Sequence, residues 1–346
     1  MKNHFLLFAF VVSFFSVSTF AQNAQTQIEV VGDKVNISAT KDINLNTGNG
    51  KVLYNGDEVA TNSDVQRAVT IVIAASNASE KSKAGADYVC TGTNDNLVIN
   101  RAIQSLPEYG GVIQLTEGDF IFNNSVWEYP KDITIQGCGR STVLHRGFTC
   151  DWDNGGLADS MLRAHSRKKT HYKDFTIDSG NMVTEGNKNN SDILCWNGDP
   201  GIMEGWCVIE NVDVINGMIH QSQLRTVAFS LSGINSRIIN CNIDVPQCTD
   251  AIWIYPERAV GVTTIISNCN TNSPITVETH KAVISNNIAS NMDIKSFNGA
   301  TATLTNNTVS GTMYLRGTNI LSTGNICGSI VNNATNSLVT NNLILK

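Results

Sequence analysis

The sequence predicts an all-β protein in which short parallel strands stack as successive coils of a solenoid, preceded by a leader of small hairpins and one helix. Three observations predict this class. The chain has only six prolines and is rich in Asn, Thr, Ser and Gly, a composition that favours short strands and turns over helices. Short β-rich runs each end in Gly, Asn or Asp. A polar pair recurs at short intervals along the C-terminal half.

Residues 1–21 have the pattern of a cleavable signal peptide. Lys2 is followed by an apolar stretch from Phe5 to Phe15 and by small residues approaching Ala21. The stretch is too short for a good membrane span, and no later segment is apolar enough for one. We therefore expect an exported protein, secreted or periplasmic, without a membrane span. An uncleaved anchor is the alternative.

The charge and cysteine counts narrow the partners and the compartment. The net charge is −6, and removal of Lys2 makes it more negative. Such a balance argues against nucleic acid as a partner, because proteins that bind a phosphate backbone usually show a basic surface. All nine cysteines follow the signal sequence. Their odd number in an oxidising compartment means that at least one thiol is free or bonded to another chain.

Residues 22–85 form the predicted leader. Alternation around Val35 and around Ile43, together with the Asn55–Gly56 turn, predicts small hairpins. A capping box at Ser63 precedes a stretch that predicts a helix over 64–83. The apolar face of that helix would consist of Val65, Ala68, Val69, Val72 and Ile73. Residues 47–66 resemble the segments with which phage tail-fibre-like proteins lead into a trimer, which implies a homotrimer; a lone hairpin packed on the main domain is the alternative.

A second helix is predicted over 94–106, at the start of the main domain. Thr93 or Asn94 would cap it, and Pro107 with Gly110 would end it. The sequence VIQL that follows is typical of a strand. Further short β-rich runs occupy 133–144, 172–181 and 206–217, and they predict successive turns of one solenoid.

The recurring polar pair gives the repeat of this solenoid. Aligning the second residue of each pair places Asn242, Asn270, Asn287, Asn307, Asn325 and Asn342 in one column. A repeat this short cannot hold two helices, but it can hold one coil of short strands that pair with the coils above and below. The stacked amides would bond to each other along the axis. Cys241 and Cys269 precede the first two and are predicted to be neighbours, either as a disulfide or as packed thiols.

The segment DYVCTGTNDNLVINRAIQSLPEYGGVIQLTEGDFIF (87–122), with ITIQGCGRSTVL and YKDFTIDSGN after it, resembles the N-terminal part of pectate-lyase-like proteins. This resemblance implies that residues 86–346 form a single-stranded right-handed parallel β-helix whose open end is capped by the 94–106 helix. The superfamily includes polysaccharide lyases, glycoside hydrolases, mannuronan epimerases and phage tailspikes. The resemblance therefore implies a glycan ligand and leaves the reaction open.

The catalytic signatures of these families are missing from the chain. It contains no Asn-Thr-Asp, Asp-Asp or Gly-His-Gly of the hydrolases and no Arg-x-Pro-x-x-Arg of the lyases. Where the epimerases have Asp-Pro-His, this sequence reads GMIHQSQLRT, so His220 is not carried over as catalytic. The run at 151–156 resembles the start of a calcium loop, but Leu162 stands where an acid is required. Neither a metal nor a cofactor is predicted.

The best candidate site is a ladder of outward side chains on four successive short strands. Alternation sends Ile252, Ile254, Ile275, Val277, Met292, Ile294, Met313 and Leu315 inward. It sends Trp253, Thr276, Asp293 and Tyr314 outward in one column and Tyr255, Glu278, Lys295 and Arg316 in the next. Aromatic faces can stack on sugar rings, and the charged groups offer acid/base and carboxylate-binding chemistry. A solvated sheet with mutually stabilising charges is the alternative.

Two functions from different classes follow. The first is an enzyme that acts on an acidic polysaccharide as a lyase, epimerase or hydrolase, with Glu278, His280, Lys295 and Arg316 catalytic and Trp253, Tyr255, Asp293 and Tyr314 binding substrate. Lys295 or His280 would remove the proton α to a uronate carboxylate that Arg316 neutralises. The second is a non-catalytic, glycan-binding adhesin or fibre protein. A basic corner at 163–173 is the next candidate for an anionic sugar.

Overall fold

The structure is a computed structural model. It describes residues 26–31, 34–39, 53–54, 57–58, 69–127, 129–148, 159–184, 190–196, 205–220, 225–255 and 261–345. The predicted signal peptide, the strand around Ile43, the capping box at Ser63 and the calcium-like run at 151–156 lie outside these residues. The chain divides into two compact units, at residues 1–67 and 68–346.

The first unit contains two antiparallel pairs of strands. Strand β1 (Thr26–Val31) pairs with β2 (Lys34–Ala39), and β3 (Leu53–Tyr54) pairs with β4 (Asp57–Glu58) across the Asn55–Gly56 position. The alternation around Val35 and the Asn-Gly signal therefore predicted these hairpins correctly.

The second unit is built from short strands with two helices, α2 (Glu80–Ala84) and α3 (Asp95–Ser105), and one 3-10 turn, η1 (Gly139–Ser141), among its described residues. Its strands are β5 (Val69–Ala74), β6 (Tyr88–Val89), β7 (Gly111–Leu115), β8 (Gly118–Phe122), β9 (Ile133–Gln136), β10 (Thr142–Arg146), β11 (Asp159–Arg163), β12 (Lys169–Asp178), β13 (Val183–Thr184), β14 (Asn190–Trp196), β15 (Trp206–Ile215), β16 (Ile219–His220), β17 (Thr226–Ser232), β18 (Asn235–Ile239), β19 (Asn242–Ile243), β20 (Asp250–Tyr255), β21 (Thr263–Ser267), β22 (Asn270–Thr271), β23 (Ile275–Ser285), β24 (Ile288–Ala289), β25 (Met292–Thr305), β26 (Thr308–Thr318), β27 (Ile320–Thr323), β28 (Ile326–Thr335), β29 (Leu338–Thr340) and β30 (Leu343–Ile344).

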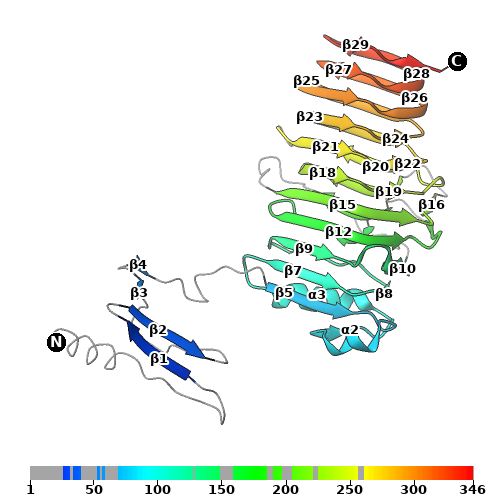
Figure 1. The fold of residues 1–346 in the computed structure, drawn as a ribbon. Coiled ribbons are helices and arrows are strands. Elements are labelled where there is room, and N and C mark those ends of the chain that lie inside the picture. Colours follow the sequence, from blue (N-terminus) through cyan, green and yellow to red (C-terminus); the bar gives the residue numbers. More distant parts are fainter. Residues whose placement is uncertain are drawn as a thin grey trace. The chain divides into compact units, whose positions relative to one another are not determined.

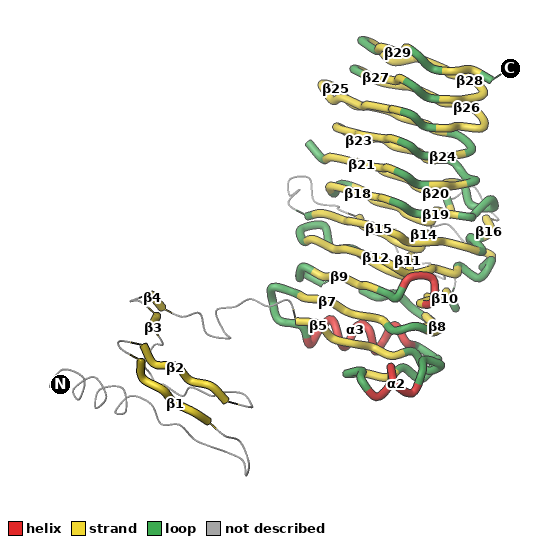
Figure 2. Tube along the Cα trace, viewed as in Figure 1, coloured by secondary structure: helices red, strands yellow, loops and turns green. Residues whose placement is uncertain are grey.

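Parallel pairing between coils organises these strands. Strand β20 pairs with β23, β23 with β25, β25 with β26 and β26 with β28, always in parallel. The chain therefore winds into a stack of coils, each bonded to the coil below and the coil above (Figure 1). Figure 2 shows strands on every coil with loops at the corners. The unit is all-β and mostly parallel, which is compatible with a parallel β-helix.

The inside of the stack is apolar, as the alternation predicted. Ile252, Ile275, Met292 and Met313 are fully buried, and each lies two residues before another buried aliphatic side chain. Because successive side chains of a strand point to opposite faces, one run of four residues supplies both the core and the outer surface.

Helix α3 confirms the helix predicted over 94–106. It lies at the N-terminal end of the stack (Figure 1) and buries Ile99, Ala102 and Ile103 in the core. Asn94, one of the two predicted cap residues, is at the N-cap, but its backbone is left-handed and its side chain makes no capping hydrogen bond. Asp95 instead accepts hydrogen bonds from the backbone N–H groups of Gly92 and Ile121, so it ties the helix to β8.

The helix predicted over 64–83 is wrong for residues 69–74. This segment is strand β5, which pairs in parallel with β7, and only the short helix α2 lies in the later part of the predicted range. Ile71 and Ile73 are buried in strand alternation, while the run VTIVIA is rich in β-branched residues. The sheet therefore starts at Val69, earlier than the predicted boundary at residue 86.

The polar corners follow a rule that the sequence alignment partly missed. Asn240, Asn268, Asn286, Asn306 and Asn341 all have φ between 54° and 57°, in the left-handed region that Asn tolerates. The residue after each of them is buried or half-buried. The backbone pairings place these following residues, Cys241, Cys269, Asn287, Asn307 and Asn342, in one column with Asn325, which follows the left-handed Gly324.

The predicted placement of Asn242 and Asn270 in this column is therefore wrong by one residue. Asn270 pairs with Ile288 rather than with Asn287, and its side chain bonds to Asn242 on the surface at 3.1 Å. At these two corners the buried position is occupied by the thiol of Cys241 or Cys269, so the Asn that follows, Asn242 or Asn270, lies on the surface. The predicted proximity of Cys241 and Cys269 is confirmed, since the pairing of β19 with β22 places these two buried residues side by side in successive coils. Both are free in the structure.

Candidate functional site

The predicted ladder of outward side chains forms one continuous surface. Thr276 pairs with Trp253 on one side and with Asp293 on the other, and Asp293 pairs with Tyr314. In the next column, Lys295 pairs with Glu278 and with Arg316. We call the outer side of β20, β23, β25 and β26 at these residues the ladder face. The structure therefore places these residues beside one another in the register that the sequence predicted.

An aromatic pair covered by a guanidinium lies at the N-terminal end of the ladder face. The rings of Trp253 and Tyr255 are 5.5 Å apart between centroids and tilted by 43°. The Cζ atom of Arg225 lies 4.3 Å from the centroid of the Trp253 ring, a cation–π distance. Tyr255 and, three coils further on, Tyr314 remain exposed. The face thus offers two separate aromatic surfaces.

Asp250 fixes Arg225 beside this aromatic pair. Its Oδ2 atom lies 3.2 Å from Nη1 of Arg225, and its Oδ1 atom accepts a hydrogen bond of 2.6 Å from the Thr276 hydroxyl. Burial raises the pKa of Asp250, and the contacts with Thr276 and Arg225 act in the opposite direction. The carboxylate is therefore a positioning group for Arg225.

Two further ion pairs cross the coils of the ladder face. Nζ of Lys295 lies 3.4 Å from Oε2 of Glu278. Arg316 binds Asp293 through both Nε, at 2.9 Å, and Nη2. The hydrogen bond that Arg316 donates to Asp293 raises the pKa of Arg316 further above its usual value. The predicted acid/base groups therefore neutralise one another when no ligand is bound.

The cations of these pairs lie further out than the acids. The side chains of Arg225, Lys295 and Arg316 are 39%, 39% and 44% exposed. Their partners Asp250, Glu278 and Asp293 are 7%, 18% and 29% exposed in the same order. The outermost charges on the ladder face are thus positive, on a chain whose net charge is −6.

His280 lies at the edge of the ladder face, where the pairing of β23 with β25 shifts register between Thr279 and Lys281. The centroids of its ring and the Phe297 ring are 5.9 Å apart, and Nζ of Lys295 lies 4.8 Å from the centroid of the same Phe297 ring. Phe297 therefore holds the imidazole and the ammonium in one group.

Sequence reasoning missed Arg225, Asp250 and Phe297. Phe297 follows Lys295 by two positions, so extending the same alternation would have found it. Asp250 directly precedes the AIWIY strand and could have been included in it. Arg225 carries no comparable signal, because its contact with Trp253 depends on a neighbouring coil.

A second guanidinium over a tryptophan occurs earlier in the same column, with Arg163 three coils and Trp127 four coils before Trp253. The Cζ atom of Arg163 lies 4.7 Å from the Trp127 ring centroid. Arg163 pairs with Leu194, Leu194 with Ser230, and Ser230 with Trp253. Trp127 is 42% exposed, so an aromatic surface is also open there. The prediction assigned Arg163 to the basic corner, and the pairing shows that it extends the column of Trp253.

Two further residues of the basic corner lie on another strand. His171 and Lys173 belong to β12, where His171 lies 3.1 Å from Glu210 and Lys173 lies 3.3 Å from Asp174. Burial lowers the pKa of His171, against the pull of Glu210. Two of the predicted cationic residues therefore have acidic partners.

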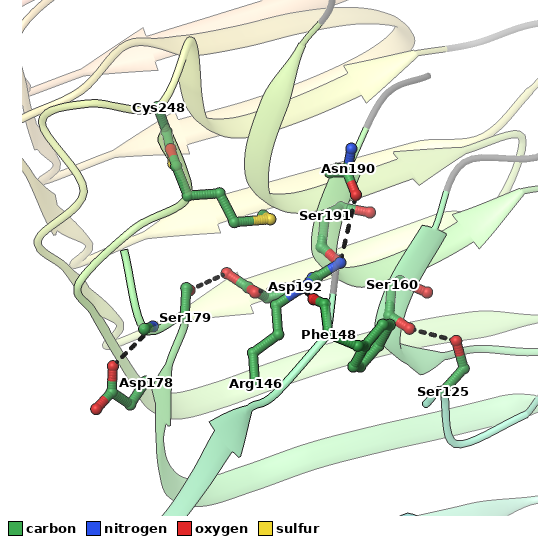
Figure 3. A network of polar contacts seen from close by, with 12 residues as sticks. Ser125, Arg146, Phe148, Ser160, Asp178, Ser179, Asn190, Ser191, Asp192 and Cys248 are labelled. Atoms are coloured by element: carbon green, nitrogen blue, oxygen red, sulfur yellow. Dashed lines mark hydrogen bonds and ion pairs between the residues drawn. The ribbon is translucent and has the colours of Figure 1, made fainter. Parts of the chain in front are cut away.

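A buried polar network inside the stack is the other cluster of charge (Figure 3). Arg146 and Asp192 are both fully buried and 3.3 Å apart. Arg146 also donates to the carbonyl of Ser191 at 2.7 Å, and the Ser179 hydroxyl donates to Asp192 at 2.8 Å. Burial raises the pKa of Asp192, which Arg146 lowers. Since neither charge reaches the solvent, we assign this network to stability.

Within the part of the chain that the structure describes, three or more His, Cys, Asp or Glu side chains nowhere gather as a metal site would require. None of the described helices has the length and apolar character needed to cross a membrane. In comparisons with known proteins, no family model and no curated protein matches this chain.

Proposed function

We propose that this protein is an exported, single-stranded right-handed β-helix that binds an acidic polysaccharide along the ladder face. One observation carries the proposal. Three cations stand out beyond their carboxylate partners on the same strip of sheet as two exposed aromatic surfaces. Cations favour the carboxylate or sulfate groups of an acidic sugar, while Trp and Tyr rings stack on the apolar faces of sugar rings.

The arrangement favours a chain that runs along the stack. Coils repeat about every 4.8 Å, so Trp253 and Tyr314 are about 14 Å apart, since three coils separate them. Trp127 lies four coils to the other side of Trp253 in the same column, beyond the buried side chains of Leu194 and Ser230. A ligand that touches all three rings must therefore span several sugar units. This geometry supports a polymer rather than a single sugar.

Binding without turnover is the function that the site supports best. Glu278, Lys295, Asp293 and Arg316 are engaged with one another, so a catalytic base or carboxylate-neutralising cation would first have to leave its partner. A cation that keeps its own carboxylate partner can still contact a ligand anion through its exposed N–H groups. A non-catalytic adhesin or fibre protein fits this arrangement.

Catalysis on the same face is the second candidate, favoured by the group around Phe297. An imidazole, an ammonium and the Glu278 carboxylate meet there. In a lyase reaction, Lys295 or His280 would take the proton α to a uronate carboxylate. The electron pair of that C–H bond would form the C=C bond as the glycosidic C–O bond breaks, and Glu278 would protonate the leaving oxygen. Arg316 would stabilise the charge on the uronate carboxylate.

A panel of acidic and neutral polysaccharides, assayed for binding and for unsaturated uronate products, tests both. We expect Trp253→Ala and Tyr314→Ala to weaken binding at least tenfold, and Lys295→Ala and Arg316→Ala to weaken binding of acidic glycans only. Tyr109→Ala and Arg237→Ala are matched controls, because both residues are exposed and lie off the ladder face. Binding that none of the four ladder variants changes would show that the site lies elsewhere. Product formation that Lys295→Ala abolishes would establish the lyase.

A further inference from the structure

We propose that one side of the stack is a self-association surface on which a second copy of this chain docks face to face. Strands β15, β18, β21, β23, β25 and β27 form this side, and Figure 1 shows them one above another. The earlier residues of β23 and β25 belong to the ladder face, and those after their register shift belong to this side. We call the outer side of the six strands the aliphatic face. The inference does not depend on the ladder face or its ligand.

Parallel pairing aligns the outward side chains of the aliphatic face in columns. From one coil to the next, the central column contains Val208, Arg237, Ile265, Val283, Thr303 and Leu321. None of the six is buried, and Val283 and Leu321 are 38% and 36% exposed. Ile239 adds another aliphatic side chain in the next column. Covering these side chains with an apolar partner would remove them from water, which is favourable.

The order of the central column is the same from both ends. It reads aliphatic, polar, aliphatic, aliphatic, polar, aliphatic. A two-fold axis that runs along the strand direction, between β21 and β23, reverses the order of the coils and sets each column opposite itself. It places Ile265 opposite Val283 of the other copy, and Val208 opposite Leu321 of the other copy. Each aliphatic side chain of the column therefore meets another, which identifies a second copy as the occupant.

The charges of the aliphatic face fit the same arrangement. Its outward side chains include one acid, Glu210, and two cations, Arg237 and Lys281. The two-fold axis sets each of them opposite a threonine of the other copy, in that order Thr323, Thr303 and Thr263. A chain with a net charge of −6 repels its own copies over most of its surface. On the aliphatic face, by contrast, two copies come together without bringing like charges opposite each other.

The repeat and the area of the face also suit a second copy. Side chains rise from the face at every coil, about 4.8 Å apart, so a surface with the same repeat fits between them over many coils. Two sheets whose strands are aligned pack in this manner. Six coils by five residues cover roughly 500 Å² on each copy, which brings the pair to the lower limit of about 1,000 Å² for a specific interface. We therefore expect a weak dimer that depends on concentration.

Sedimentation velocity of the full chain over a range of concentrations tests this proposal. We expect a monomer–dimer equilibrium whose dissociation constant rises at least tenfold in Val283→Lys, because an ammonium group then lies opposite Ile265 beside the two-fold axis. Ile288→Lys is the matched control. Ile288 is 51% exposed and lies on β24, which pairs with β22 and β26 on another side of the stack. We expect this variant to dimerise within about twofold of the parent chain.

A gain of affinity tests the two-fold arrangement itself. Thr303→Glu sets a carboxylate opposite Arg237 of the other copy, twice in each dimer. We expect its dissociation constant to fall at least threefold at low salt, and the gain to disappear at high salt. Thr308→Glu is the control, because Thr308 is exposed on β26, on another side of the same coil. It adds the same charge to an acidic chain, so it should leave the dimer unchanged or weaken it.

Three results would overturn the proposal. The first is a chain that remains monomeric at high micromolar concentration. The second is a dimer or larger assembly that Val283→Lys and Ile288→Lys leave equally intact, since the contact would then lie outside the aliphatic face. The third is an equal effect of Thr303→Glu and Thr308→Glu, since the copies would then not meet about an axis between β21 and β23.

Discussion

Oδ1 of Asn307 accepts two hydrogen bonds from Asn287, at 3.1 Å from its backbone nitrogen and at 3.0 Å from Nδ2. The Asn307 amide in turn donates to the carbonyl of Ile284 and to Asn325, at 3.0 and 2.9 Å. Both asparagines are buried. One side chain thus satisfies groups from three other residues.

We therefore predict that Asn307→Ala destabilises the stack. Each buried polar group left without a partner costs about 1–3 kcal/mol, and this substitution leaves at least two such donors on Asn287. Asn242→Ala is the control, because the Asn242–Asn270 pair is on the surface and its loss should stay within about 0.5 kcal/mol. Urea unfolding followed by tryptophan fluorescence measures both. Equal midpoints for the two variants would contradict the role of the buried column.

The buried Arg146–Asp192 pair should be far more sensitive than an exposed one. Removing a single partner from a buried ion pair typically costs about 3–5 kcal/mol, because an uncompensated charge stays behind. We expect this loss for Asp192→Ala, and a smaller loss for Arg146→Met combined with Asp192→Leu. The exposed pair Arg140–Asp213, 2.6 Å apart, supplies the control: Arg140→Ala should cost less than about 1 kcal/mol. Thermal unfolding of the four proteins compares them, and a double variant no more stable than Asp192→Ala would refute this account.

His171 should make the stability of the fold depend on pH near neutrality. Burial lowers its pKa in the folded chain below the ordinary value of 6.5, so the unfolded chain binds the proton first. The stabilising contribution is present above pH 6.5 and is lost as the pH falls through the lowered pKa. The melting temperature of the parent chain should therefore fall more between pH 8 and pH 5 than that of His171→Gln. Parallel curves would show that the pKa of His171 does not differ between the folded and the unfolded chain.

Cysteine labelling should separate one thiol from the rest of the described cysteines. Cys138 is exposed, whereas Cys207, Cys241, Cys248 and Cys269 are buried. Burial raises the pKa of Cys207 and Cys248 to about 12, so little thiolate is available at neutral pH. We expect iodoacetamide to modify Cys138 first in the folded chain, and non-reducing peptide maps to contain no Cys241–Cys269 disulfide. Modification of Cys207 at the rate of Cys138 would contradict the buried placement.

If Trp127 belongs to the glycan surface, affinity should depend on the length of the ligand. Long oligosaccharides should lose affinity in Trp127→Ala, and oligosaccharides too short to reach from Trp253 to Trp127 should not. Leu97→Ala, an exposed apolar residue on α3, is the control for nonspecific loss. Isothermal titration with a series of increasing length measures the effect. A loss that is the same at every length would remove Trp127 from the surface and leave the ladder face unaffected.

The columns of the ladder were predictable because alternation within a strand is strict. Once Ile252 and Ile254 are taken as core, Trp253 and Tyr255 must point outward. The contacts between those side chains were not predictable in the same way. Arg316 lies next to Lys295 in its own column, yet it binds Asp293 in the other column. Which acid it binds depends on the length of its side chain and on the charges of the neighbouring coil, and alternation within one strand gives neither.

Two wrong predictions from the sequence have a common cause. Val69–Ala74 has apolar residues at positions that suit a helix and also a strand, and pairing with β7 decided for the strand. The corner column was misaligned at Asn270 because the sequence shows two Asn flanking Cys269, and only the left-handed φ of Asn268 shows which residue turns the chain. In both cases the decisive information lies in another coil.

Because the coils turn at Asn residues with the same left-handed backbone, one coil is a natural unit of chain length. Asn286 and Asn306 have the same backbone conformation, and each precedes a buried Asn of the same column. Excising residues 287–306 would join Asn286 to Asn307 and recreate the junction that Asn286 already forms with Asn287. Because each coil bonds only to its neighbours, the molecule can be shortened or extended by whole coils without designing a new corner. Insertions and deletions of one coil are then the changes of chain length that evolution could accept most readily, and an engineer could use them to set the reach of the molecule.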